Sequence, residues 1–256
     1  MQIKYKHDEV THNLVSPSII VPLLIDFIQP ASVVDVGCGI GTFLNQFKEN
    51  GIENLLGFDG EWLNIDLLEK YIDKSKVQIV DLQNTISIDR KFDLAISLEV
   101  AEHVEGKYAD IFVENLIKLS DVIVFSAAFP GQGGQNHVNE QWPDYWINKF
   151  KNHNYQVFDV LRSIFWDDER IDLWYRQNTF LFIKYNYPNL KEVLSRISMY
   201  YKSDTMSDVI KIHPQYGLLI QDRLTEYRNI KTGKMPFFYY VKLLIKSFLF
   251  KLKIRS

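Results

Sequence analysis

Short apolar runs alternate with amphipathic stretches over the first 185 residues of this chain. The run Ser32–Val36 (SVVDV) is β-branched and ends in glycines, which is typical of a buried strand. After it, Phe43, Leu44 and Phe47 recur at helical spacing until Gly51 ends the helix. The same pattern predicts further strands at Leu55–Phe58, Val77–Val80, Phe92–Ser97, Val122–Ser126, Gln156–Val160 and Phe180–Tyr185. It predicts helices at Thr42–Asn50, Trp62–Tyr71, Tyr108–Leu119 and Tyr145–Asn152.

The alternation of strands and helices indicates an α/β fold of Rossmann-like type, with a mostly parallel sheet covered by helices on both faces. The aromatic segment Leu161–Asn178 joins the last two strands, which allows the seventh to lie antiparallel beside the fifth. Beyond residue 185 the pattern changes to helical stretches around Leu190–Tyr200 and Tyr216–Tyr227. We therefore expect one domain over residues 1–185 and a helical C-terminal extension over residues 186–256.

The last residues of the chain form a basic apolar tail. Lys234–Ser256 holds six basic residues and no acidic one, with apolar residues at helical spacing opposite Lys242, Lys246 and Lys253. Such a helix can lie on an anionic membrane surface. It can equally dock on its own domain or on a second subunit.

Composition narrows the class of protein. With 256 residues, 46% of them hydrophobic and 24% charged, the chain is an ordinary globular one and not a disordered or coiled-coil protein. A net charge of −3 argues against a dedicated nucleic-acid binder. A single cysteine, Cys38, fits a reducing compartment. The N-terminus has no apolar signal region and no apolar run reaches about 18 residues, so we expect a cytoplasmic protein that touches at most the inner face of a membrane.

A glycine-rich loop joins the first predicted strand to its helix. Gly37, Gly39 and Gly41 permit a tight turn and close approach of a ligand to the backbone, but their spacing is not the G-x-G-x-x-G of a dinucleotide site. Asp35 at the end of the strand would repel a pyrophosphate and suits a cationic ligand. Asp59 ends the second strand and can accept both ribose hydroxyls, while Asp81 and Leu82 follow the third strand and can bind a base. Together they describe a pocket for a positively charged nucleoside.

Four motifs in order, VVDVGCGIGTF, GFDG, VDL and FDLAISLEVAEHVE, resemble those of class I S-adenosylmethionine-dependent methyltransferases over residues 12–185. The resemblance implies a seven-stranded sheet with an antiparallel last strand and S-adenosyl-L-methionine as cofactor. It implies that Asp35 and the glycines of the loop (Gly37, Gly39, Gly41) hold the methionine part, Asp59 the ribose, and Asp81 and Leu82 the adenine. Glu99, after the fourth strand, is expected to touch the cofactor as well.

The box Glu99-Val100-Ala101-Glu102-His103 follows the fourth strand. If it is helical, Glu99, Glu102 and His103 share one face and can hold a divalent metal ion such as Mn²⁺, Fe²⁺ or Mg²⁺. The box resembles those of small-RNA 3′-terminal methyltransferases and ubiquinone-pathway O-methyltransferases, in which such a set grips acceptor hydroxyls through a metal. In other class I enzymes the same box holds no metal.

The glycine-rich loop after the fifth strand carries His137, which can be the fourth metal ligand or a general base. Together with His103 and Glu102 it makes up the candidate catalytic set. Asn139 and Glu140 can bond acceptor hydroxyls, or one of them can cap the helix that follows Trp142-Pro143.

The segments HVNEQWPDYW and LWYRQNTF resemble bacterial methyltransferases of polysaccharide and capsule biosynthesis. Aromatic residues are dense between Trp142 and Tyr175, where they can stack on sugar rings or pack in the core. Arg176 can bind a nucleotide diphosphate.

We therefore expect an O-methyltransferase that acts on a sugar or sugar-nucleotide hydroxyl. The alternatives are a methyltransferase for a phosphoramidate or another small capsule substituent, one for a lipid or quinone intermediate, and a cofactor-binding partner subunit without catalytic activity.

Overall fold

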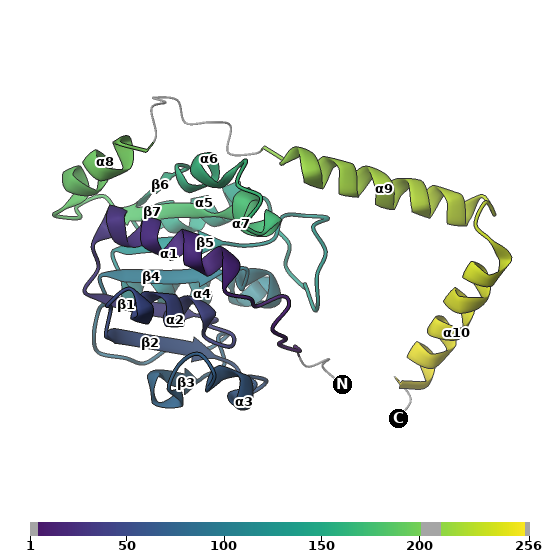
Figure 1. The fold of residues 1–256 in the computed structure, drawn as a ribbon, viewed down its shortest axis with the longest axis horizontal. Helices are drawn as coiled ribbons and strands as arrows, with labels where there is room; N and C mark the ends of the chain where they lie inside the picture. Colours follow the sequence, from purple (N-terminus) through teal and green to yellow (C-terminus); the bar gives the residue numbers. More distant parts are fainter. Residues whose placement is uncertain (1–4, 201–210, 254–256) are drawn as a thin grey trace. The chain divides into compact units, whose positions relative to one another are not determined.

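Seven strands form one mixed sheet in the computed structural model, which describes residues 5–200 and 211–253 (Figure 1). The strands are β1 (Ser32–Val36), β2 (Asn54–Asp59), β3 (Val77–Ile79), β4 (Leu94–Leu98), β5 (Val122–Ser126), β6 (Tyr155–Phe158) and β7 (Phe180–Lys184). Their order is β3-β2-β1-β4-β5-β7-β6. The first five strands pair in parallel, and β7 pairs antiparallel with both β5 and β6. The predicted fold class and the insertion of the seventh strand beside the fifth are confirmed.

The three central strands are buried along their whole length. Every residue of β1, β4 and β5 is buried, because helices cover the sheet on both faces and leave no solvated side. This explains why these segments are continuous apolar runs and not alternating ones.

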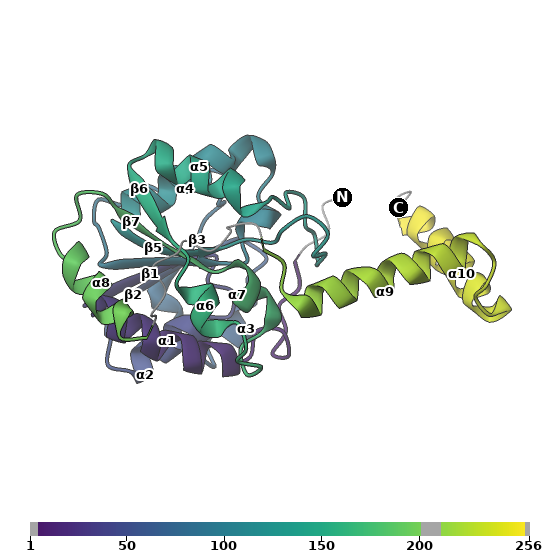
Figure 2. The same cartoon turned by 90° about the horizontal axis from the view of Figure 1, so that it is seen from above.

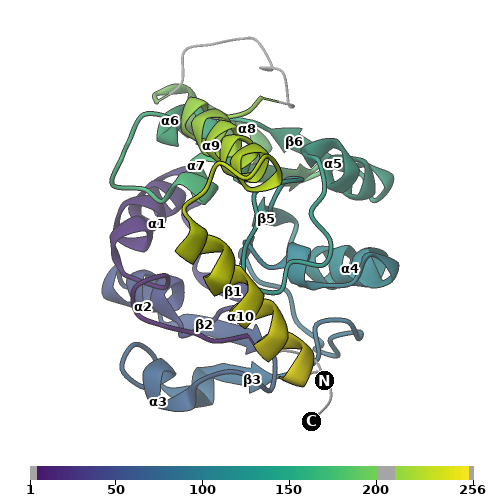
Figure 3. The ribbon, with the colours of Figure 1, turned by 90° about the vertical axis from the view of Figure 1, so that its right-hand side faces the viewer.

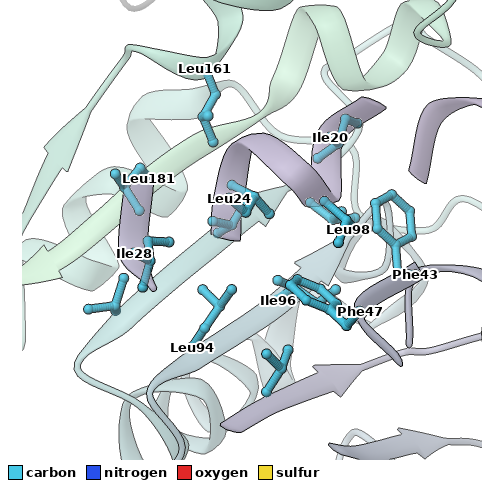
Figure 4. Packing of buried hydrophobic residues seen from close by; sticks show 14 of the residues in the cluster. Ile20, Leu24, Ile28, Phe43, Phe47, Leu94, Ile96, Leu98, Leu161 and Leu181 are labelled. Carbon is cyan, nitrogen blue, oxygen red and sulfur yellow. The ribbon is translucent and has the colours of Figure 1, made fainter. Parts of the chain in front are cut away.

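Helices lie on the two faces in unequal number. They are α1 (Val15–Ile28), α2 (Thr42–Glu49), α3 (Ile65–Leu68), α4 (Ala109–Leu119), α5 (Pro143–Asn152), α6 (Leu161–Phe165), α7 (Leu173–Asn178) and α8 (Leu190–Ser198). Figures 2 and 3 show α4 and α5 on one face, with α1 and α2 on the other. The core on the α1 side joins Leu24, Phe47, Ile96 and Leu181 (Figure 4), and the core on the other side is centred on Phe112, Phe125 and Phe150.

Three of these helices were not predicted from the pattern. In α1 the apolar residues run almost all round, and Pro22 lies inside the helix, so no amphipathic period marks it. The helices α6 and α7 have five and six residues, which is too short for a periodic signal. The predicted helix Trp62–Tyr71 is reduced to the single turn of α3, which the Asn64 side chain caps.

The chain divides into two compact units, one of residues 4–211 and one that begins at Ile212. The first unit extends past the predicted domain boundary at residue 185, because Val193 and Ile197 of α8 are buried in the core with Phe27 of α1. The second unit contains α9 (Pro214–Lys231) and α10 (Phe237–Lys253). No helix in residues 5–200 or 211–253 is long and apolar enough to cross a membrane.

Candidate active site

The carboxyl ends of β1, β2, β4 and β5 meet at one edge of the sheet, where the site is built. Parallel register pairs Val36 with Phe58 and Leu98 with Ser126, so the loops that follow these strands emerge together. Open α/β sheets bind ligands at this edge.

The loop after β1 needs its glycines. Gly37 and Gly41 have φ angles of 86° and 82°, in the left-handed region that favours glycine. A Cβ atom on Gly37 would lie 2.4 Å from a methyl carbon of Val100, and one on Gly41 would lie 2.6 Å from a methyl carbon of Ile72. The loop is therefore shaped by backbone conformation and by close packing, and only glycine fits at these two positions.

Asp59 at the end of β2 binds this loop directly. The Gly39 amide donates to Oδ2 over 2.7 Å and the Gly60 amide donates to Oδ1 over 2.7 Å. Burial raises the pKa of Asp59 to about 6, although both backbone donors oppose the rise. The Trp62 side chain also hydrogen-bonds this carboxylate, and the lone-pair capacity that remains lets the same side chain hold the loop and accept from the ribose.

Asp35 lies in β1 beside the same loop and is buried. Its pKa is raised well above the ordinary value by burial and then by the charge of Asp59. A cationic ligand would relieve this cost, which fits a site for a sulfonium or an ammonium group.

Asp81 and Leu82 follow β3, and the structure separates their environments. Leu82 is buried in the core on the α4 side. Asp81 is exposed, accepting from the Gln83 amide (2.9 Å) and the Asn84 side chain (3.2 Å). Their role toward adenine stays a prediction.

The box after β4 is not the α-helix that would place Glu99, Glu102 and His103 on one face, so that expectation is wrong. Only Ala101–His103 forms a 3-10 turn, and Glu99 has a left-handed φ of 56°. Glu99 turns instead toward two amides: the Gln132 side chain donates to it over 2.7 Å and the Asn178 side chain over 3.0 Å. Glu99 is therefore not one of the residues whose potential ligand atoms converge.

Glu102, His103 and His137 do come together, with one potential ligand atom of each within 4.8 Å of the others. The loop after β5 is tied to the box because the amides of Val138 and Asn139 donate to the Glu102 carbonyl, over 2.9 and 3.0 Å. Among the described residues, neither carboxylate oxygen of Glu102 has a hydrogen-bond partner. Burial and then the charge of Glu99 raise the pKa of Glu102 well above its ordinary range. A buried carboxyl without partners is expensive unless a ligand completes it.

His137 is oriented by Glu140. Its Nδ1 lies 2.8 Å from Glu140 Oε1, and its Nε2 lies 3.9 Å from Glu102 Oε1. The amides of Gly131 and Gly133 donate to the two Glu140 oxygens over 2.8 and 2.7 Å. Burial works to raise the pKa of Glu140, but hydrogen bonds from Gly131, His137 and Gly133 outweigh it and lower the pKa. An ionised Glu140 can only accept, so it favours the tautomer in which Nδ1–H of His137 donates to it and the Nε2 lone pair faces Glu102.

The structure does not support the helix cap that was one of the predicted roles of Asn139 and Glu140. Helix α5 begins after Trp142 with no side-chain cap in the described structure, so neither residue caps it. Asn139 is buried and its side-chain oxygen accepts from Gln141 over 2.9 Å.

The N-terminal segment also reaches this site, although no sequence motif marks it. The Tyr5 ring lies 5.0 Å from the His103 ring, and His103 lies 4.9 Å from His137. Burial, and then the charge of Glu102, raise the pKa of Tyr5 to about 12. Burial, and then His137, lower the pKa of His103 to about 4.

The aromatic and arginine candidates are mostly engaged elsewhere. Trp146 and Phe165 are buried in the two cores, while Trp142 is 37% exposed and stacks on Phe129. Arg176 is buried and donates to the Trp166 carbonyl over 3.4 Å. Its expected use for a diphosphate therefore finds no support from this geometry.

The sheet with its antiparallel β7, the glycine loop after β1 and the acidic strand ends define a class I S-adenosylmethionine-dependent methyltransferase. The family model described as a methyltransferase domain matches residues 16–167, more than half of the chain, and the chain belongs to that family. The predictions of S-adenosyl-L-methionine as cofactor and of an enzyme are thereby confirmed. The family match favours an enzyme over the alternative of a non-catalytic subunit.

Curated relatives match a shorter segment. The ubiquinone biosynthesis O-methyltransferase of Rickettsia conorii is 35% identical over 94 residues, which cover 36% of this chain and 32% of that protein. The protein of the same name from Rickettsia bellii is 33% identical over 94 residues, covering 36% of this chain and 38% of that protein. The match thus spans about a third of these relatives' length.

Solved structures share the fold. The sugar N-methyltransferase KedS8 of Streptoalloteichus superposes with a TM-score of 0.53 and 11% identity, covering 72% of this chain and 97% of that one. The amino pentose methyltransferase CalS10 of Micromonospora echinaspora gives 0.51 and 12%, covering 72% and 100%. At these identities the likeness concerns the fold alone.

Proposed function

We propose that this methyltransferase transfers the methyl group of S-adenosyl-L-methionine to a sugar hydroxyl in the biosynthesis of a cell-surface polysaccharide such as a capsule. The observation that carries the proposal is the pair of His137 and Glu140 beside the buried Glu102. A hydroxyl is a poor nucleophile and has to lose its proton during attack, whereas a neutral amine needs no base. A histidine oriented by a carboxylate thus favours oxygen as the acceptor.

The chain's own residues divide the work between two sides of the site. Asp35, the glycine loop, Asp59 and Glu99 hold the cofactor, which supplies an electrophilic methyl group on a sulfonium. His137 Nε2 accepts the hydroxyl proton, while Glu140 keeps Nδ1 protonated and fixes the ring. Glu102 binds the same hydroxyl or its neighbour. Positioning the oxygen in line with the methyl group supplies much of the rate.

The cluster of Glu102, His103 and His137 also fits a divalent metal ion, since its ligand atoms converge and the Glu102 oxygens lack partners among the described residues. We propose Mn²⁺, Fe²⁺ or Mg²⁺ on these three residues, with Glu99 left to the cofactor side. An ion bound there would take the Nε2 lone pair of His137, so it would replace His137 as the group that acidifies the acceptor hydroxyl. Glu140 would still orient His137, as carboxylates commonly do behind metal-bound histidines.

Dialysis against a chelator and add-back of each ion tests the metal proposal. Stoichiometric binding of one ion, lost in His137→Ala and retained in His153→Ala, is the expected result in calorimetry. Absence of binding together with full activity in excess chelator would leave His137 as a plain base.

The acceptor is tested by incubating the purified protein with S-adenosylmethionine and a panel of sugar nucleotides, glycan fragments and phenolic quinone precursors. We expect mass spectrometry to find an O-methylated sugar, formed by the wild type and His153→Ala but not by His137→Ala. Methylation of the quinone precursor instead would favour the second candidate, which the names of the curated relatives suggest. Methylation on nitrogen would overturn the proposed use of the base.

We propose that α10 attaches the enzyme to an anionic membrane surface, where polymer precursors are assembled. Phe237, Phe238 and Leu244 are 74%, 76% and 71% exposed, and the segment carries basic but no acidic residues. Co-sedimentation should show binding to vesicles with phosphatidylserine but not to neutral ones, reduced by salt and by Phe238→Ser. Dimerisation through α10 without vesicle binding would contradict it.

A further inference from the structure

The N-terminal segment Tyr5–His12 lies over the cofactor loop. A Cβ atom on Gly39 would lie 3.4 Å from a ring carbon of His12 and 3.5 Å from the ring of His7. The two imidazoles therefore lie directly against the part of the loop whose amide binds Asp59. Nothing in the four methyltransferase motifs accounts for them.

Tyr5 extends the same segment toward the acceptor side. Its ring contacts His7 at 5.0 Å and His103 at 5.0 Å, so a continuous aromatic chain leads from the glycine loop to the candidate catalytic set. The Tyr5 hydroxyl also lies 3.5 Å from Nε2 of His12, so the side chains of Tyr5, His7 and His12 form one cluster.

A separate contact holds this segment in place. Glu9 accepts from Lys70 over 2.9 Å through one oxygen and from the Tyr71 hydroxyl over 3.0 Å through the other. These partners follow α3, in the segment whose Ile72 packs against Gly41. Within the segment, Asp8 accepts from the amides of Val10 and Thr11 and so folds the chain into a turn between Glu9 and His12.

We infer that Tyr5, His7 and His12 are cofactor-site residues that close over the bound nucleoside, and that Glu9 is the positioning residue that latches them to Lys70 and Tyr71. The inference concerns cofactor retention and holds for any acceptor, so it does not depend on the proposed sugar chemistry. The contact of Glu9 with Lys70 is exposed, so Glu9 can be replaced without disturbing the core.

The test is the dissociation rate of S-adenosylhomocysteine from the full chain, measured by stopped-flow displacement. An exposed ion pair contributes little, so Glu9→Ala should accelerate release by about two- to fivefold and raise KM for the cofactor by a similar factor, with no fall in kcat. Added salt should accelerate release from the wild type and not further from Glu9→Ala. Glu69→Ala is the matched control, because Glu69 is 45% exposed like Glu9 and pairs with Lys74 at 2.9 Å.

Hydrogen exchange supplies a second measurement, which does not depend on catalytic activity. Binding of S-adenosylhomocysteine should slow amide exchange over residues 5–12, and Glu9→Ala should reduce that protection. Release rates equal in wild type, Glu9→Ala and Glu69→Ala, or exchange over residues 5–12 that is unchanged by the ligand, would overturn the inference.

Discussion

At the scale of single residues, Asp59 has two tasks, because it both holds the Gly39 amide and faces the expected ribose. Asp59→Ala removes an ionised acceptor and frees the loop, so we expect the affinity for S-adenosylhomocysteine to fall by about 1.5–3 kcal/mol. Calorimetry measures it, with the exposed turn residue Asp73→Ala as control. If Asp59→Ala keeps the wild-type affinity, the assignment of Asp59 as the acceptor of the ribose hydroxyls is wrong.

Glu140 is the residue whose charge acts through another side chain. Glu140→Gln keeps an oxygen acceptor for His137 Nδ1 but replaces the other carboxylate oxygen, which accepts from a glycine amide of the loop, with an NH2 group. The loop and the His137 ring should lose part of their fixed orientation, and we expect kcat to fall by roughly 10- to 100-fold. Glu105→Gln, a surface acid paired with Lys107, should behave as wild type. A kcat for Glu140→Gln equal to that of the wild type would contradict the role of Glu140 in orienting His137.

Most of the site residues that could be named from the sequence are those that end a strand or begin the next loop. Asp35, Asp59 and Glu102 follow from strand position, because the carboxyl ends of parallel strands must share one edge. Gln132, Asn178 and Tyr5 could not be found this way. They reach Glu99 or His103 from segments far along the chain, and ordinary amides and phenols carry no local signature.

At the scale of elements, the glycines on either side of α2 distinguish two costs of replacing glycine: backbone strain at a positive φ and a steric clash of the added Cβ atom. Gly37→Ala has to accept both a φ of 86° and a clash with Val100, whereas Gly51→Ala, at a φ of 88°, meets nothing in the described chain within 4 Å. We expect urea unfolding to show a loss of about 1 kcal/mol for Gly51→Ala and at least about 1 kcal/mol more for Gly37→Ala. Equal losses would mean that the close packing on Val100 is of no consequence.

Elements were predictable where periodicity was strong. All seven strands were placed within about two residues. The signal is strongest for β1, β4 and β5, because burial on both faces favours a largely apolar run. The box at residues 99–103 was misjudged because an i, i+3, i+4 spacing is compatible with a helix but does not require one, and the left-handed Glu99 breaks it.

At the scale of the whole molecule, the buried histidines make stability depend on pH. Burial, and then His12, lower the pKa of His7 from 6.5 to about 4, with Asp8 opposing and His103 adding to the effect. As the pH falls, His7 is protonated in the unfolded chain before it is protonated in the fold. The unfolding free energy that His7 contributes above pH 6.5 is therefore lost as the pH falls toward 4. His7→Gln should reduce the loss of unfolding free energy between pH 7 and pH 5 by ~2 kcal/mol.

Asp59 works in the opposite direction over part of this range. Its folded pKa of about 6 lies above its unfolded value, so protonation of Asp59 favours the fold as the pH falls below 6. Denaturant titrations at pH 7, 6 and 5 give the unfolding free energy of the wild type, His7→Gln and the control His153→Gln. The difference between the wild type and His7→Gln isolates the contribution of His7 from that of Asp59. Parallel stability curves for wild type and His7→Gln would contradict the assignment.

The C-terminal unit should be separable from cofactor binding. Every candidate cofactor residue, from Tyr5 to Glu99, lies inside the first compact unit. Truncation before Lys234 should therefore leave the calorimetric affinity for S-adenosylhomocysteine unchanged while abolishing vesicle binding. Loss of cofactor affinity in a soluble truncated protein would show that the tail takes part in the site.

The position of β7 sets a limit on how far the chain can be shortened from its C-terminal end. Because β7 lies between β5 and β6, it alone connects β6 to the rest of the sheet in the described part of the chain. A fragment cut to the family match at residues 16–167 would keep β6 without a neighbour and leave β5, whose first four residues are apolar, as an unpaired edge strand. Such an edge is a template for intermolecular pairing and aggregation. A minimal soluble methyltransferase therefore has to extend at least to Lys184, even though the sequence family is recognisable without those residues.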